Sequence, residues 1–176
     1  KLAVMKATLE IQKKSVNTAI LQNEMDLKNA NLQRFGKFEF SPADEIRQAQ
    51  FVADERKKLS DETLRNRMLA AALEHDVEMK NIAKKNLDDK AKVKELQEVE
   101  RAAFIEKAKQ IQAEADFTRM TLEKARLEAM VGAASKGTVA ERGEAAMAAG
   151  FDDAGVAQQI KLTEAVVSPF MEKMKE

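Results

Sequence analysis

The feature that most constrains this chain is a stretch of about 89 residues, between Pro42 and Gly132, that contains neither proline nor glycine. Those two residues are the strongest interrupters of helices, so their absence favours unbroken helix. One continuous helix of that length would extend about 135 Å at about 1.5 Å per residue. We therefore predict a long central helix over 42–131. A bend or hairpin at about 60 or 86–89 is the alternative, because Ser60-Asp61-Glu62 can restart a helix and helix propensity dips near Asn86-Leu87-Asp88-Asp89.

The composition agrees with helix throughout. The apolar residues are mostly Ala, Leu, Met, Val and Ile, with eight Phe and no Trp or Tyr, whereas sheets favour β-branched and aromatic residues. Acidic residues precede basic ones by four positions, a helix-stabilising spacing, at Asp61/Arg65, Asp76/Lys80 and Asp88/Lys92. The predicted fold class is all-α, with long helices in a coiled-coil or extended bundle arrangement and a small C-terminal helical cap.

An amphipathic helix is predicted over 1–35, where apolar residues recur at helical spacing: Leu2, Met5, Leu9, Val16, Ile20 and Leu27. Gln12 and Asn23 interrupt this stripe, either as solvated positions, the favoured interpretation, or as polar groups that fix the register of a partner helix. Gly36 should end the helix. A connector over 36–41 should anchor its two Phe residues under the helices, and Ser41-Pro42 should start the next helix.

The clearest helical seam lies between Leu96 and Val131, where residues such as Gln110 and Ala113 also fall on alternating three- and four-residue steps. A second apolar stripe, which includes Ala108 and Ala115, runs beside it, so the apolar surface is broader than a two-stranded coiled coil needs. Bundles or higher oligomers fit that width better. The predicted partner-helix interface consists of Leu96, Val99, Ala103, Phe104, Ile111, Phe117, Met120, Leu122, Leu127 and Val131.

Residues 132–176 are predicted to form a glycine-containing joint followed by short helices. Thr138-Val139-Ala140-Glu141 matches a capping box that would begin one helix, and Gly150 would close it. Further starts are predicted at Phe151 and at Ser168-Pro169.

Candidate chemistry is sparse. Gly132-Ala133-Ala134-Ser135-Lys136-Gly137-Thr138 resembles a phosphate-binding loop only superficially, because its Lys precedes the second Gly and it follows a helix instead of a strand, so a joint between helices is favoured. The single histidine, His75, lies among acidic neighbours and is expected to be solvated rather than a metal ligand. We predict no catalytic residue, cofactor or metal site, and a protein that is not an enzyme.

The balance of charges indicates which kinds of partner the chain can attract. Lys plus Arg and Asp plus Glu both number 30, which gives no overall field to attract nucleic acid. A helix needs about 20 consecutive apolar residues to span a bilayer, and no run in this sequence approaches that length. We expect a soluble chain, in the cytoplasm or within an assembled particle, whose partners are further copies of itself or other proteins of an assembly.

The long helices rich in Ala, Gln, Lys and Glu resemble, in general composition, internal virion, scaffolding or DNA-ejection proteins of phages, although no diagnostic motif assigns a family. The expected function is thus that of a structural coiled-coil subunit that oligomerises within a larger macromolecular assembly. The alternative is a peripheral protein whose amphipathic helices bind or remodel a bilayer, which the mixed charges disfavour.

Overall fold

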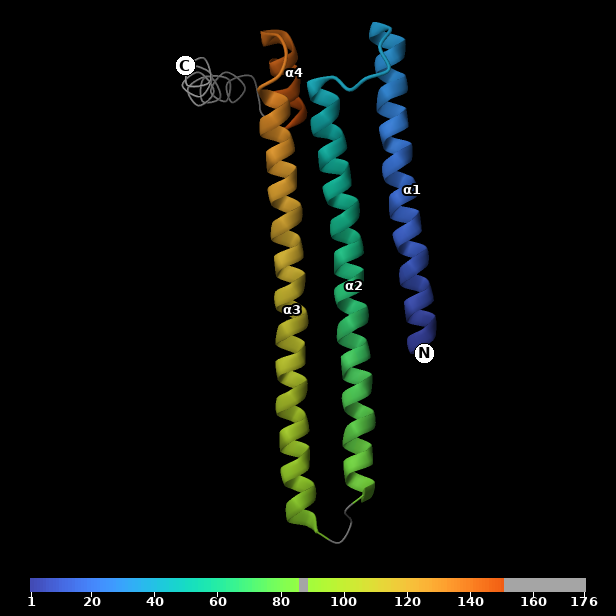
Figure 1. Ribbon diagram of the computed structural model, residues 1–176, viewed down its shortest axis with the longest axis vertical. Helices are drawn as coiled ribbons and strands as arrows, with labels where there is room; N and C mark the ends of the chain where they lie inside the picture. Colours follow the sequence, from blue (N-terminus) through green and yellow to red (C-terminus); the bar gives the residue numbers. More distant parts are fainter. Residues whose placement is uncertain (86–88, 151–176) are drawn as a thin grey trace, which may run out of the picture. The chain divides into compact units, whose positions relative to one another are not determined.

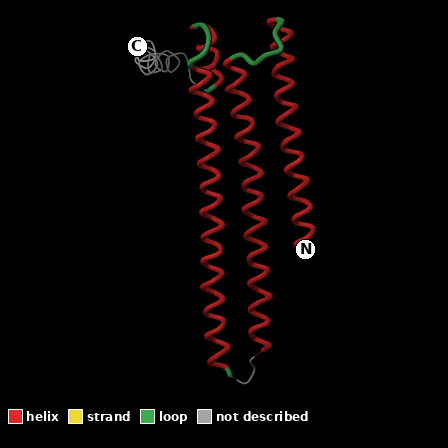
Figure 2. The backbone as a smooth tube through the Cα atoms, viewed as in Figure 1, coloured by secondary structure: helices red, strands yellow, loops and turns green. Residues whose placement is uncertain are grey.

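A computed structural model describes residues 1–85 and 89–150. It contains four helices: α1 (Leu2–Phe35), α2 (Pro42–Lys85), α3 (Lys90–Ala134) and α4 (Val139–Ala148) (Figure 1). Within the described ranges every regular element is a helix, as Figure 2 shows, and three long helices pack against each other. The predicted all-α class, with long packed helices and a short helix after them, is confirmed.

The range 42–131 holds two helices, α2 and α3, instead of one. Residue 60 lies inside α2 without interruption, so no restart occurs there. Of the other expected break, residues 86–88 lie outside the described part of the chain. The two helices run antiparallel, because residues later in α2 contact residues earlier in α3. Asp61 contacts Arg119, and His75 contacts Glu100. The structure therefore has the hairpin arrangement.

Local sequence signals account for the helix ends. Gly36 has φ +69°, the left-handed conformation that glycine adopts without steric cost, and it directly follows the last residue of α1. At the start of α2, the Asp44 amide donates to Ser41 Oγ (3.2 Å), and the Ser41 amide donates to Asp44 Oδ2 (3.3 Å). Both predicted boundaries are confirmed, and the Ser41 cap is reciprocal.

The connector 36–41 differs from its prediction. Phe38 is 45% exposed and Phe40 is only partly buried, so neither anchors a core. Instead the Lys28 ammonium lies over both rings, 5.9 Å from the Phe38 centroid and 5.2 Å from that of Phe40. The Asn31 amide side chain is buried and donates to the Glu39 carbonyl. Cation–π and hydrogen-bond contacts therefore hold the connector, rather than apolar burial.

The described chain forms two compact units, each built from segments of all three long helices. The first unit comprises Lys1–Lys13 and Lys57–Met120, and its buried apolar residues are Ala71, Ile82, Ile111 and Ala115. The second comprises Lys14–Arg56 and the chain from Thr121 onward. Its core contains Ile46, Ala133 and Ala145, with Met130, Ala148 and Ala149 packed around them. Alanine supplies most of the second core and half of the buried apolar residues of the first unit.

The predicted stripe of α1 is partly buried from Met5 to Leu27, whereas Leu2 is 39% exposed. Its polar interruptions are partly buried too, so the expectation that they are solvated is wrong. In the second unit, the Asn23 amide donates to the Gln48 side chain, which in turn donates to the Ile20 carbonyl (3.2 Å). In the first unit, Gln12 Oε1 is buried, and no described donor reaches it. Such groups favour one register of α1 on α2.

Thr138 begins α4 as predicted. Its hydroxyl accepts from the Glu141 amide (3.3 Å), and the Glu141 carboxylate accepts from the Thr138 amide (2.7 Å). Gly150, with φ +91°, follows the last turn. Gly132, by contrast, lies inside α3, so the joint is shorter than predicted and spans 135–138. The helices predicted from Phe151 and from Ser168-Pro169 lie outside the described residues.

Candidate interaction surface on helix α3

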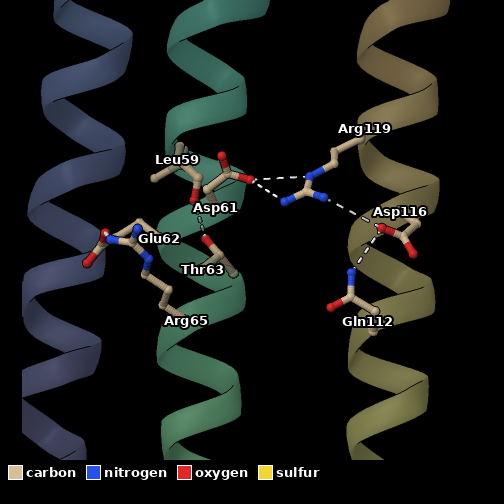
Figure 3. Close-up of polar contacts among 8 residues, drawn as sticks. All are labelled: Leu59, Asp61, Glu62, Thr63, Arg65, Gln112, Asp116 and Arg119. Carbon is tan, nitrogen blue, oxygen red and sulfur yellow. Dashed lines mark hydrogen bonds and ion pairs between the residues drawn. The ribbon is translucent and has the colours of Figure 1, made fainter.

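Polar side chains tie α3 to α2 within the first unit. Arg119 donates to Asp61 Oδ1 through Nε (3.3 Å) and Nη2 (2.7 Å), and its Nη1 lies 3.7 Å from Asp116 (Figure 3). The hydrogen bond and the charge of Asp61 raise the pKa of the Arg119 guanidinium. Further along the hairpin, Arg67 pairs with Glu114 (2.5 Å), and Lys107 with Glu74 (2.5 Å). All three pairs agree with an antiparallel register of α2 and α3.

Asp61 thus pairs with Arg119 of α3 and not, as predicted, with Arg65 of its own helix. Arg65 lies 3.9 Å from Glu62 instead, an i,i+3 contact, and Figure 3 labels both side chains. The Asp76–Lys80 pair is present at 2.6 Å, as predicted. Asp88 lies outside the described residues.

His75 belongs to the packing between α2 and α3. Its ring stacks on Phe104 with centroids 4.6 Å apart, and its Nδ1 lies 3.1 Å from Glu100 Oε1. The His75 side chain is only 21% exposed, so the expectation of a solvated histidine is wrong. A surface hollow of about 310 Å³ adjoins it, lined by Ala71, Glu74, His75, Glu100, Phe104 and Lys107 among others. At this hollow Lys107 pairs with Glu74, and His75 contacts Glu100.

The inner face of α3 carries part of the predicted interface. Ile111 is 4% exposed, seven residues after Phe104 and therefore on the same face of the helix. Leu122, in the second unit, is partly buried. Intrachain packing thus occupies Phe104, Ile111 and Leu122, which the sequence assigned to a partner helix.

The remaining predicted residues form an exposed face. In the first unit, Leu96 is 38% exposed, Val99 63%, Phe117 68% and Met120 65%, and Ala103 is also exposed. In the second unit, Leu127 is 48% and Val131 63% exposed. At about 100° per residue, Val99 and Phe117 lie roughly 120° to 140° around the helix from Phe104 and Ile111. The clearest seam in the sequence therefore points away from the chain's own core.

We call the first-unit part of this face the outer α3 stripe, and its members are Leu96, Val99, Ala103, Glu106, Gln110, Ala113, Phe117 and Met120. All are exposed. They alternate in steps of three and four residues, the repeat of a coiled-coil seam. Exposed apolar side chains that occur singly need no explanation, but a periodic row on one helix face is typical of an interaction surface.

A second exposed row, on α1, was missed in the sequence. Val4 and Ile11 are 68% and 67% exposed in the first unit, and Leu21, Met25 and Leu32 are 62%, 46% and 44% exposed in the second. Val4, Ile11, Met25 and Leu32 fall on a seven-residue repeat whose middle position is the polar Thr18, and that spacing is the signal in the sequence. The parallel stripe from Met5 to Leu27 already accounts for an amphipathic helix, so the sequence alone does not single out this row.

The Gly132–Thr138 segment does not form a phosphate cradle. The amides of Ser135 and Lys136 donate to the carbonyls of Val131 and Ala133, at 3.2 and 3.1 Å. The Lys136 ammonium pairs with Glu45 (3.2 Å). The groups that would hold a phosphate are therefore used within the fold.

Within residues 1–85 and 89–150, no group of three or more His, Cys, Asp or Glu side chains is placed to hold a metal ion. None of the described helices is sufficiently long and apolar to cross a membrane. Comparison of the chain with protein-family models, curated proteins and solved structures finds no match.

Proposed function

We propose that this protein is a non-enzymatic structural subunit that associates with further helices, its own or those of other proteins, within a larger macromolecular assembly. The observation that carries the proposal is the outer α3 stripe. It has the period of a coiled-coil seam, yet its large members Val99, Phe117 and Met120 are each more than 60% exposed.

The hydrophobic effect gives such a surface a reason to be covered. Burying one large apolar side chain contributes about 1.5 to 3 kcal/mol relative to full exposure. Several such side chains in one row therefore favour a partner helix, after the entropy of association is subtracted. A coiled-coil subunit of an assembled particle, such as an internal virion, scaffolding or ejection component, is one setting that suits this surface.

The test is Phe117→Asp, because a charge in the middle of the stripe would have to be desolvated on docking. Self-association is measured by sedimentation velocity and light scattering over a range of protein concentrations, with helix content followed by circular dichroism. We expect the unchanged protein to self-associate, and the variant to be monomeric with the same helix content.

Val77→Asp is the matched control, since Val77 lies on α2 and is also exposed, at 56%. It should leave self-association unchanged. A parent protein that stays monomeric, and whose binding to partner proteins is insensitive to Phe117→Asp, would contradict the proposal. Co-sedimentation with anionic vesicles that is abolished by Phe117→Asp would instead support the membrane alternative.

A further inference from the structure

We infer that the outer α3 stripe is self-complementary and that it pairs antiparallel with the same stripe of a second copy of this chain. This inference depends on the proposed function and specifies the partner and the register. The order of residue types along the stripe carries it: large apolar residues occupy both ends, alanines lie inside them, and two polar residues lie at the centre.

In an antiparallel coiled coil, a residue at heptad position a of one helix faces a residue at position d of the other. With the two-fold axis at the centre of the stripe, Leu96 faces Met120 and Val99 faces Phe117. Ala103 then faces Ala113, and Glu106 faces Gln110. Every apolar residue meets an apolar residue, and every polar residue meets a polar one.

The central layers have matching chemistry. The Gln110 side-chain amide can donate to the Glu106 carboxylate of the other copy, a charge-assisted hydrogen bond that occurs twice by symmetry. Beside these layers, the small side chains of Ala103 and Ala113 permit close approach of the helices. All of these residues are exposed, so no rearrangement of the chain's own core is needed.

Other registers are poorer. A shift of one heptad in either direction places Glu106 opposite an apolar residue, Ala103 or Phe117, which would bury a carboxylate without a partner. A parallel, in-register pair would oppose Glu106 to Glu106, and like charges across an interface are unfavourable. The pairing also has two-fold symmetry, the commonest symmetry of soluble homo-oligomers.

The first test changes the charge opposite Glu106. Gln110→Glu opposes two carboxylates in each central layer, and Gln110→Lys opposes a carboxylate and an ammonium. We expect the dimer dissociation constant to rise about tenfold in the first variant and to fall in the second, because charges across an interface govern its specificity. Gln110 is exposed, and its side-chain amide donates a 3.4 Å hydrogen bond to Glu114 on the same helix, so both variants should fold.

The second test uses disulfide cross-linking. The sequence contains no cysteine, so each introduced cysteine is the only thiol of its chain. Leu96→Cys protein is mixed with a size-tagged Met120→Cys protein under mild oxidation. We expect disulfide-linked pairs of one tagged and one untagged chain, and little linkage of Leu96→Cys protein to itself. The reverse pattern would indicate a parallel pair and would overturn the inference.

The control on α1 is Leu21→Asp, at a residue 62% exposed, which should leave the dimer intact. Loss of the dimer in this variant would mean that the exposed row on α1 supplies the partner surface, which also overturns the inference. If Phe117→Asp abolishes self-association while both Gln110 variants leave it unchanged, the proposed function stands and the antiparallel register fails.

Discussion

Two isoleucines on α3 allow a direct measurement of which face of the helix is buried. Ile111 is 4% exposed and Ile105 is 53% exposed, and both lie in the first unit. The substitution to alanine is chemically the same at both positions. Any difference in its cost therefore reports the surroundings of each side chain.

The expected magnitude follows from the buried groups. Ile→Ala removes three carbon groups, which at about 0.8 kcal/mol each contribute about 2.4 kcal/mol when fully buried. A residual cavity raises the loss toward about 4 kcal/mol, and the better helix propensity of alanine offsets roughly 0.4 kcal/mol. Ile111→Ala should thus lower the free energy of unfolding by about 2 to 4 kcal/mol. Ile105→Ala should lower it by roughly 0.7 kcal/mol, since about half of that side chain is already solvated and the better helix propensity of alanine offsets part of the loss.

The assay is urea unfolding followed by circular dichroism at 222 nm. It should be repeated at tenfold lower protein concentration, because self-association adds to apparent stability by mass action. Equal losses at the two positions, or a larger loss for Ile105→Ala, would refute the conclusion that Ile111 lies on a buried face of α3 and Ile105 on an exposed one.

Two further predictions concern polar contacts. In a double-mutant cycle, alanine substitutions at Asp61 and Arg119 should give a coupling energy of about 0.2 to 1 kcal/mol, because both side chains are 41% exposed and solvent screens the pair. A coupling energy well above that range, measured by urea unfolding, would contradict this screening. Thr138→Ala should increase amide hydrogen exchange in α4, since removing such a cap costs about 0.5 to 2 kcal/mol. Thr118→Ala is the control and should not change exchange in α4, because the Thr118 hydroxyl donates to the Glu114 carbonyl on an exposed turn of α3.

The sequence by itself determined the features that arise within a few residues. The cap at Ser41, the capping box at Thr138 and the left-handed Gly36 were all predictable, because a helix end is satisfied by side chains three or four positions away. The apolar rows of α3 were equally predictable, since side chains return to the same face of a helix every 3.6 residues whatever lies around it.

Only the tertiary structure decided how those rows are used. Two apolar rows lie on α3, and the sequence favoured the one with the stricter repeat as the seam. The fold buries the other, because Phe104 stacks on His75 and Ile111 is buried, which leaves Val99 and Phe117 exposed. Asp61 likewise pairs with Arg119, 58 positions away, instead of its neighbour Arg65. A helical period shows that a face is apolar, but which partner covers it depends on contacts between residues far apart in the chain.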